Sequence, residues 1–115
     1  MLTARAAIEV YDRPQLDARL QAVWADFKTA LRAGDAAAAA SFLHSGRRAV
    51  WGEYFGRLTP AQFAETDVTF TDIVLLEVTP GRAECEMMRD VGGLLYSFPI
   101  AFEIDVDGVW RLWQF

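Results

Sequence analysis

The sequence has few of the residues that build cross-links and metal sites. It contains one cysteine, Cys85, and one histidine, His44, among 115 residues. A single cysteine cannot form a disulfide within the chain, and a zinc site built from cysteines needs several thiolates. We therefore expect a fold that is held together by its core, with no structural metal and no cofactor.

Basic residues and long apolar runs are also scarce. Lys and Arg number 11 against 16 Asp and Glu, which gives a formal net charge of −5. Nucleic-acid-binding domains usually carry a basic patch or stripe, so we expect no nucleic-acid partner. No run approaches the roughly 18 apolar residues that a membrane span needs, and no N-terminal segment has the pattern of a signal peptide. These absences predict no membrane insertion.

The amino-acid composition changes near residue 65, from rich in alanine to rich in β-branched residues. The hydrophobic fraction is 53%, which is enough to build a core. Sixteen of the 18 alanines precede residue 66, whereas 13 of the 20 Val, Ile and Thr residues follow residue 65. Alanine favours helix and β-branched residues favour strand. Helices followed by strands, without alternation between the two, indicate the α+β class.

The first half predicts helices. Residues 14–33 form the longest one, because apolar side chains recur there at spacings of three and four. Pro14 suits a first helical turn, and Gly34 favours the end of the helix. Each of three shorter helices is predicted at a capping signal: residues 36–43 behind Asp35, a third helix opened by Ser45 and reaching Leu58, and a fourth that begins at the capping box Thr59-Pro60-Ala61-Gln62.

The second half predicts an antiparallel meander of four strands joined by short turns. The strands are expected at residues 67–78, 82–91, 94–106 and 109–115. Asp72 interrupts an apolar alternation and Pro99 has no amide hydrogen, so a bulge is predicted at Asp72, and a bulge or an unpaired edge at Pro99. One face of the third strand should meet the helices: Tyr96, Phe98, Ile100, Phe102, Ile104 and Val106.

The helix stripe that ends in Ala30-Leu31-Arg32-Ala33-Gly34-Asp35, together with Phe42 and the terminal segment 107–115 (DGVWRLWQF), resembles the NTF2-like superfamily. The resemblance covers residues 14–115 and implies a cone-shaped domain, with three to four helices packed on a curved four-stranded antiparallel sheet. Two departures stand out. Many relatives have a short hairpin where residues 45–65 look helical here, and the Tyr, His or Asp groups of isomerase and dehydratase members have no matching set.

The segment before this domain has a different pattern. Residues 3–11 alternate as a lone strand, which either pairs with the sheet edge or belongs to a preceding domain. The stretch Ala6-Ala7-Ile8-Glu9-Val10-Tyr11-Asp12-Arg13-Pro14 looks like the closing strand of an immunoglobulin-like repeat. Similar junctions occur where an NTF2-like domain ends an exported bacterial protein. This likeness implies that residues 1–13 are a strand or linker left from a preceding domain. It also favours a periplasmic or extracellular location over a cytoplasmic one.

Two titratable residues are weighed as catalytic bases. A carboxylate such as Asp72 in an apolar run has a raised pKa if it is buried, although it could equally lie in a bulge that faces solvent. His44 lies at the predicted end of the second helix, and no carboxylate is expected beside its ring. Ser45 next to it reads as a helix N-cap rather than a nucleophile. Glu103 and Asp105 share a strand face that we expect to be solvated, and Asp105-x-Asp107-Gly108 reads as a hairpin turn.

Aromatic residues carry the remaining signal. Either they are simply core, or they line a pocket inside the cone, with Tyr54 and Tyr96 as polar handles. The predicted pocket residues are Trp24, Trp51, Tyr54, Phe55, Phe70, Met87, Tyr96, Phe98 and Trp110. The other face of the last strand, with Val109, Trp113 and Phe115, is also apolar; if it is exposed, it would form a patch suited to a homodimer or another docking contact.

The sequence thus predicts a non-catalytic binding or accessory domain, with an apolar pocket or sheet face for a small molecule or a protein partner. One alternative is a small enzyme of isomerase or dehydratase type, in which Asp72 or His44 is the base and Tyr54 or Tyr96 donates a hydrogen bond. Another is a purely structural dimerisation module.

Overall fold

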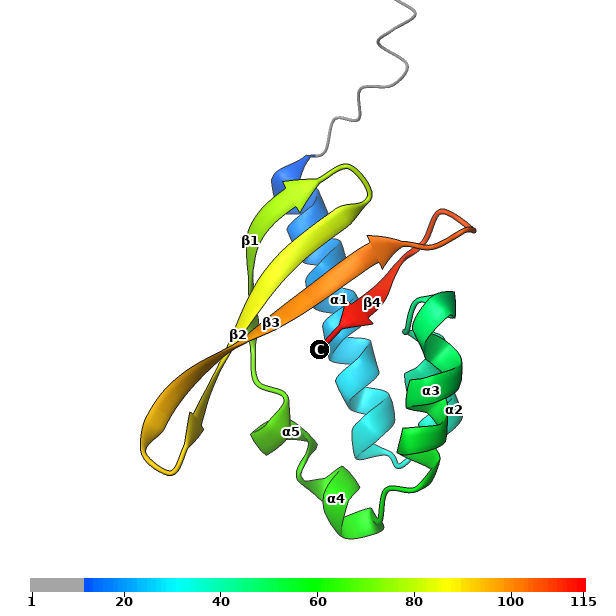
Figure 1. Ribbon diagram of the computed structural model, residues 1–115, viewed down its shortest axis with the longest axis vertical. Coiled ribbons are helices and arrows are strands. Elements are labelled where there is room, and N and C mark those ends of the chain that lie inside the picture. Colours follow the sequence, from blue (N-terminus) through cyan, green and yellow to red (C-terminus); the bar gives the residue numbers. More distant parts are fainter. Residues whose placement is uncertain (1–11) are drawn as a thin grey trace, which may run out of the picture.

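The computed structural model describes residues 12–115, so the predicted strand at residues 3–11 lies outside the described residues. The α+β class is confirmed. Five helices pack on one open, four-stranded antiparallel sheet (Figure 1). The elements are α1 (Arg13–Arg32), α2 (Ala36–Ser41), α3 (Ser45–Gly56), α4 (Pro60–Ala64), α5 (Thr66–Thr69), β1 (Ile73–Thr79), β2 (Arg82–Val91), β3 (Leu94–Ile104) and β4 (Trp110–Gln114).

The sheet is a meander in the order β1-β2-β3-β4, as predicted from its short turns. Its β4 edge is covered by residues 42–44. The amide of Leu112 donates to the carbonyl of Phe42 at 2.9 Å, and the amide of His44 donates to the carbonyl of Leu112 at 2.8 Å. This short parallel pairing joins the end of α2 to the sheet, and α3 starts directly after it.

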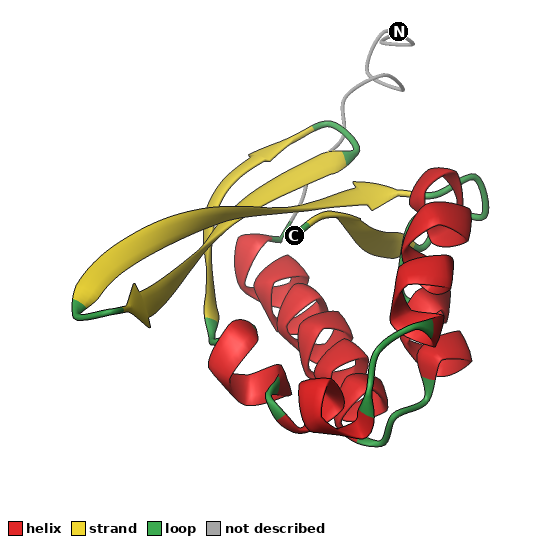
Figure 2. Cartoon of the chain, turned by 60° about the horizontal axis from the view of Figure 1, so that its bottom comes forward, coloured by secondary structure: helices red, strands yellow, loops and turns green. Residues whose placement is uncertain are grey.

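Helix α1 lies across one face of the sheet, and its apolar stripe forms the centre of the core (Figure 2). Its polar side chains also reach the outer edge of the sheet. The Trp24 indole donates to the carbonyl of Thr71 at 2.8 Å, and the Gln21 amide donates to that of Ile73 at 2.9 Å. Arg13 donates to the carbonyl of Leu75 at 3.1 Å. These bonds occupy backbone acceptors that an exposed edge would otherwise present to another chain.

The helix boundaries follow the predicted capping signals closely. Asp35 accepts from the amide of Ala38 at 3.0 Å, and Thr59 and Gln62 form the predicted capping box of α4. The cap of α3 is a correction. The helix begins at Ser45, but its N-cap is His44, whose Nδ1 accepts from the amide of Gly46 at 3.1 Å. The second helix also ends at Ser41 rather than at residue 43.

The segment between the helices and the sheet was predicted wrongly. The first strand was expected from residue 67, but Thr66–Thr69 forms the short helix α5, and β1 begins only at Ile73. Asp72 therefore precedes the strand and is exposed, and the bulge predicted there lies instead between Leu75 and Glu77. A helix of β-branched residues forms here because its neighbours hold it, against local propensity.

A bulge in β4 reverses the faces of the last residues. Leu112 pairs with Phe102 and Gln114 with Ala101, which leaves Trp113 as the extra residue. Such an insertion shifts the alternation of every residue that follows. Phe115 consequently points toward the helices and lies 5.4 Å from the ring of Phe27. The predicted outer apolar face with Val109, Trp113 and Phe115 is therefore wrong.

The far half of the β2–β3 hairpin extends past the helices (Figures 1 and 2). Along the predicted inward face of β3, Ile100 and Phe102 are buried, and Phe98 and Ile104 pack partly buried against the core. Tyr96 is 46% exposed near the tip, and Val106 is 95% exposed in the turn after the strand. At Pro99 the edge toward β4 is unpaired, because the β3–β4 pairing runs only from Ala101 to Ile104.

No helix within residues 12–115 is long and apolar enough to cross a membrane.

Candidate functional site

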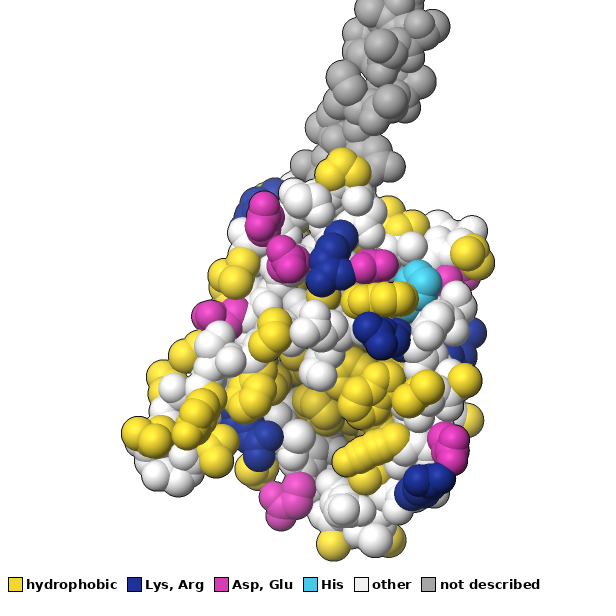
Figure 3. All heavy atoms as spheres, viewed as in Figure 1, with side chains coloured by type: hydrophobic (Ala, Val, Ile, Leu, Met, Phe, Trp, Pro, Cys, Tyr) yellow, Lys and Arg dark blue, Asp and Glu magenta, His cyan; other side chains and the backbone are white. Residues whose placement is uncertain are grey.

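A cavity of about 370 Å³ lies where the ends of several helices meet. Figure 3 shows hydrophobic side chains gathered in this region, between the sheet and α3, α4 and α5. Six of its lining residues are aromatic, two are leucines and four are polar. They are Leu31, Trp51, Tyr54, Phe55, Leu58, Gln62, Phe63, Glu65, Thr66, Thr69, Phe70 and Phe115.

Helix α3 supplies one wall. Trp51, Tyr54 and Phe55 are spaced by three and four residues, so they share one face of the helix. The rings of Trp51 and Tyr54 lie 5.4 Å apart at 76°, and the ring of Trp51 lies 4.6 Å from that of Phe115. Most rings of the lining are thus held at angles to one another, although Phe55 and Phe115 are stacked at 28°.

The floor is formed by residues that are packed from behind. Phe27 of α1 is fully buried, and its ring lies 5.8 Å from that of Phe55, 5.8 Å from that of Phe70 and 5.4 Å from that of Phe115. Close packing of this kind keeps side chains in fixed rotamers. The cavity is therefore preformed on its inner side.

The remaining wall comes from α4 and α5. The capping box at Thr59 starts α4 and places Gln62 and Phe63 beside the cavity. The hydroxyl of Thr66 donates to the carbonyl of Phe63 at 2.6 Å, and this bond links α5 to α4. Thr66 is the one buried polar residue of this wall, so its hydroxyl is already hydrogen-bonded within the fold. The two short helices therefore act as one unit.

The polar side chains of the lining differ in whether they have hydrogen-bond or ion-pair partners. The side chain of Gln62 accepts from the amide of Thr59 at 2.8 Å in the capping box. The carboxylate of Glu65, by contrast, has no hydrogen bond or ion pair with any group in residues 12–115, and the side chain is exposed. Tyr54 is 45% exposed, so its polar end is within reach of solvent. Among residues 12–115, those that line the cavity include no Lys, Arg or His.

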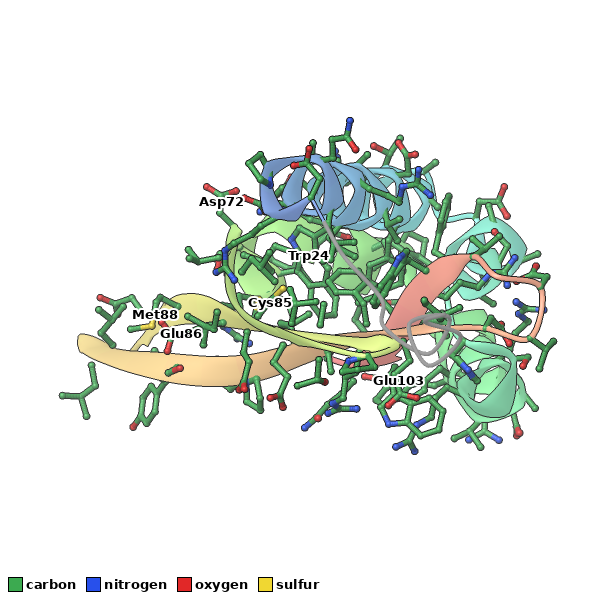
Figure 4. The ribbon with its side chains drawn as sticks, turned by 90° about the horizontal axis from the view of Figure 1, so that it is seen from above. Trp24, Asp72, Cys85, Glu86, Met88 and Glu103 are labelled. Carbon is green, nitrogen blue, oxygen red and sulfur yellow. The ribbon has the colours of Figure 1, made fainter. Side chains whose placement is uncertain are left out.

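The structure brings together four of the nine predicted pocket residues: Trp51, Tyr54, Phe55 and Phe70. The others lie elsewhere. Trp24, Met87 and Trp110 are buried in the core, and Figure 4 shows Trp24 between α1 and the sheet, near Cys85. Tyr96 and Phe98 lie next to each other on the far half of the hairpin, with ring centroids 6.4 Å apart.

Several lining residues were missed by the sequence reasoning. Phe63 had a local signal, because the capping box predicted a helix that contains it. Thr69 had none, since residues 67–78 were read as a strand, and Glu65 lies just before that range with no pattern that marks it. Phe115 was assigned to the opposite face, because the bulge at Trp113 depends on the pairing of β4 with β3 and is not visible in the sequence.

Asp72 lies in a different and more polar depression, of about 270 Å³, beside α1. Figure 4 shows Asp72 at the margin of the molecule, and Trp24 contributes to the lining of the same depression. The lining also includes Asp67, which pairs with Lys28 at 3.3 Å and with Arg32 at 3.2 Å. Asp72 is exposed, so the buried setting on which its candidacy as a catalytic base depended is missing.

His44 lies beside a buried carboxylate, which corrects two predictions. Asp105 is 4% exposed instead of solvated, and its Oδ1 is 3.6 Å from Nε2 of His44. Neither residue lines the aromatic cavity. The hydroxyl of Ser45 donates to Asp105 at 2.7 Å, so it is directed at the acid and not at the imidazole. This arrangement lacks the serine–histidine contact of a nucleophilic triad.

Asp105 is saturated with donors. Besides the hydroxyl of Ser45, it accepts from the amides of Ser45 and Val106, both at 2.8 Å, and from Arg111 at 3.0 Å. These bonds, led by that of the Ser45 hydroxyl, hold the pKa of Asp105 well below its ordinary value, although burial alone would raise it. Asp105 thereby joins the first turn of α3 to the β3–β4 turn.

Arg111 and Asp107 extend this cluster toward solvent. Arg111 makes two bonds of 2.8 Å to Asp107, which lower the pKa of that carboxyl and raise the pKa of the guanidinium. The amide of Gly108 donates to the carbonyl of Asp105 at 2.9 Å, which confirms the predicted hairpin turn. Among residues 12–115 no three His, Cys, Asp or Glu side chains lie close enough to hold a metal ion.

The buried position of Cys85 makes its thiol unreactive. Cys85 is buried in the core, and burial, followed by the charge of Asp17, raises its pKa to about 12. A thiol with this pKa forms almost no thiolate at neutral pH, so it packs as a small apolar side chain.

Comparison with profiles of known protein families, with curated proteins and with solved structures finds no significant match for this chain.

Proposed function

We propose that this domain binds a small, largely apolar molecule in the aromatic cavity and performs no chemistry on it. The observation that carries the proposal is the cavity itself: about 370 Å³, with eight of its twelve lining residues apolar or aromatic. Ligand sites in proteins are typically concave, about 300–1,000 Å³ in volume and mostly apolar, with a few polar groups that orient the ligand.

The packing behind the cavity supports the same proposal. Phe27 and Phe55 are 0% and 3% exposed and contact each other, so the inner wall does not have to be assembled when a ligand enters. A preformed site avoids much of the entropic cost of ordering side chains on binding.

A binding role is favoured over a catalytic one by the positions of the two candidate bases. Asp72 lines another depression, and His44 contacts Asp105 and Trp113. A general base must come within hydrogen-bond distance of the proton that it removes. Neither Asp72 nor His44 lines the cavity. Tyr54 does line it, and neither candidate base contacts Tyr54.

We further propose that the domain is an NTF2-like cone that serves as an accessory module. Helices laid across one face of an antiparallel meander, with a cavity between them, support this architecture. The terminal segment from Asp107 to Phe115, on which the resemblance was based, contributes Phe115 to the cavity.

The proposal is tested with a neutral apolar fluorescent probe, N-phenyl-1-naphthylamine. The probe should bind the wild-type chain with a rise in its emission, and Thr69→Phe, which adds a ring inside the cavity, should weaken binding by about tenfold or more, a difference of about 1.4 kcal/mol. Val68→Phe is the matched control, because Val68 is 61% exposed on the same helix and does not line the cavity. Equal binding by the wild type and Thr69→Phe would place the probe elsewhere and contradict the proposal.

A further inference from the structure

We infer that the ligand of the aromatic cavity is an organic cation: an ammonium group carried on an apolar body. The inference rests on the proposed function and names the class of molecule that this site would take. It is carried by the combination of aromatic rings, one unpaired carboxylate and no basic side chain in the lining.

The charge of the site comes from Glu65. This residue lies between α4 and α5, and within residues 12–115 its carboxylate contacts no cation and no hydrogen-bond donor. Nearby acids are already neutralised, since Asp67 pairs with Lys28 and Arg32, and Glu53 pairs with Arg57. Glu65 is thus the carboxylate of this region that is left for a ligand.

The aromatic rings, like the Glu65 carboxylate, attract a positively charged ligand. An aromatic face carries partial negative charge, so a cation within about 6 Å of a ring centroid is stabilised, and more so where water is excluded. Trp51 meets Tyr54 at 76° and Phe115 at 46°, so these three lining rings do not share one plane. Recognition of quaternary ammonium groups by aromatic cages uses this arrangement.

The C-terminal ends of two helices beside the cavity also favour a cation over an anion. Leu31 lies in the last turn of α1, and Tyr54 and Phe55 lie in the last turn of α3. The C-terminal end of a helix carries partial negative charge from its aligned peptide dipoles, although the carbonyls of Leu31, Tyr54 and Phe55 each accept a hydrogen bond from a backbone amide beyond the helix. The basic residues at these ends, Arg32 and Arg57, are paired with Asp67 and Glu53. An anionic ligand would meet Glu65 and two helix C-termini without a base in the lining.

The experiment compares two molecules of nearly the same shape, choline and its neutral carbon analogue 3,3-dimethylbutan-1-ol, by NMR titration of the folded chain. Choline should bind roughly tenfold more tightly than the alcohol. Glu65→Gln should remove most of this preference and leave the affinity for the alcohol unchanged. Glu53→Gln makes the same change of charge on a residue outside the lining, and it should behave like the wild type.

A second variant tests the rings separately from the carboxylate. Trp51→Leu keeps the wall apolar but removes one aromatic face, so choline should lose affinity by several-fold while the alcohol loses little. The indole N–H signal that disappears in this variant also identifies Trp51, which should be the tryptophan whose signal shifts when choline is added to the wild type.

The outcomes separate the two proposals. Tighter binding of choline that depends on Glu65 supports the inference. If the alcohol binds as tightly as choline, or if Glu65→Gln leaves the preference intact, the inference is overturned while the apolar site stands. If choline, the alcohol and N-phenyl-1-naphthylamine all fail to bind, both proposals are overturned.

Discussion

Two carboxylates in this small domain have opposite surroundings. Asp105 is buried and accepts hydrogen bonds from Ser45, Val106 and Arg111. Glu65 is exposed at the edge of an aromatic cavity and has no partner within residues 12–115. A carboxylate whose acceptor sites are filled by its own fold has little left to offer a ligand. A carboxylate left unpaired beside apolar rings contributes little to the fold and remains available for binding.

The buried charged cluster lies at one end of α3, and the proposed binding site lies at the other. Asp105 connects the first turn of α3 to the turn between β3 and β4, close to His44 and Arg48. The opposite end of α3 carries Tyr54 and Phe55 into the cavity. The same helix is thus fixed by a charged cluster at its N-terminus and presents aromatic rings at its C-terminus.

The largest expected effect is that of Asp105→Asn on stability. The variant removes a buried charge to which several donors are directed, and we expect the free energy of unfolding to fall by about 3 kcal/mol or more. Urea denaturation followed by circular dichroism measures it. Asp107→Asn is the control, since Asp107 also pairs with Arg111 but its side chain is 49% exposed, and its loss of stability should be much the smaller of the two. Equal losses in both variants would contradict the structural role of Asp105.

The next effect is a dependence of stability on pH. The pKa of Asp105 is lowered in the folded chain, so its contribution is complete above the pKa of the unfolded carboxyl and is lost as pH falls toward the folded value. The difference in unfolding free energy between the wild type and Asp105→Asn should therefore shrink between about pH 5 and pH 2. A difference that stays constant across this range would show that Asp105 is not ionised in the folded chain.

A smaller effect is expected from the Ser45 hydroxyl, whose hydrogen bond contributes most to the low pKa of Asp105. Ser45→Ala removes one hydrogen bond to a buried charge and should cost roughly 1.5 kcal/mol. Ser41→Ala is the matched control, because the hydroxyl of Ser41 is exposed and bonds only to the carbonyl of Ala38 in its own helix. Thermal unfolding of the two variants should give a clear shift for Ser45→Ala and almost none for Ser41→Ala.

The smallest effect on stability is expected at the other carboxylate. Glu65→Gln breaks no contact within residues 12–115, so its free energy of unfolding should stay within about 0.5 kcal/mol of the wild-type value. Urea denaturation is again the measurement. A loss as large as that of Ser45→Ala would mean that Glu65 has a structural partner, and the contrast between the two carboxylates would fail.

The parts of the fold that the sequence predicted are local ones. The stripe of α1, the cap at Asp35 and the capping box at Thr59 each depend on residues within one or two turns, and each is present in the structure. Trp51, Tyr54 and Phe55 could be placed on one helix face for the same reason.

The parts that could not be predicted depend on contacts between distant segments. Asp105 reads as a solvated strand residue until α3 is brought beside it, since its partner Ser45 lies 60 positions away. Phe115 enters the cavity only because a bulge shifts the pairing of β4 with β3. Glu65 becomes part of the site because residues 66–69 form a helix against their β propensity.

The most direct test of the central claim is a crystal structure of the chain with N-phenyl-1-naphthylamine. The account predicts the probe among Trp51, Phe63 and Phe115, with Asp105 and its donors unchanged at the other end of α3. A probe bound on the sheet or in the depression beside Asp72, with the aromatic cavity left empty, would contradict it.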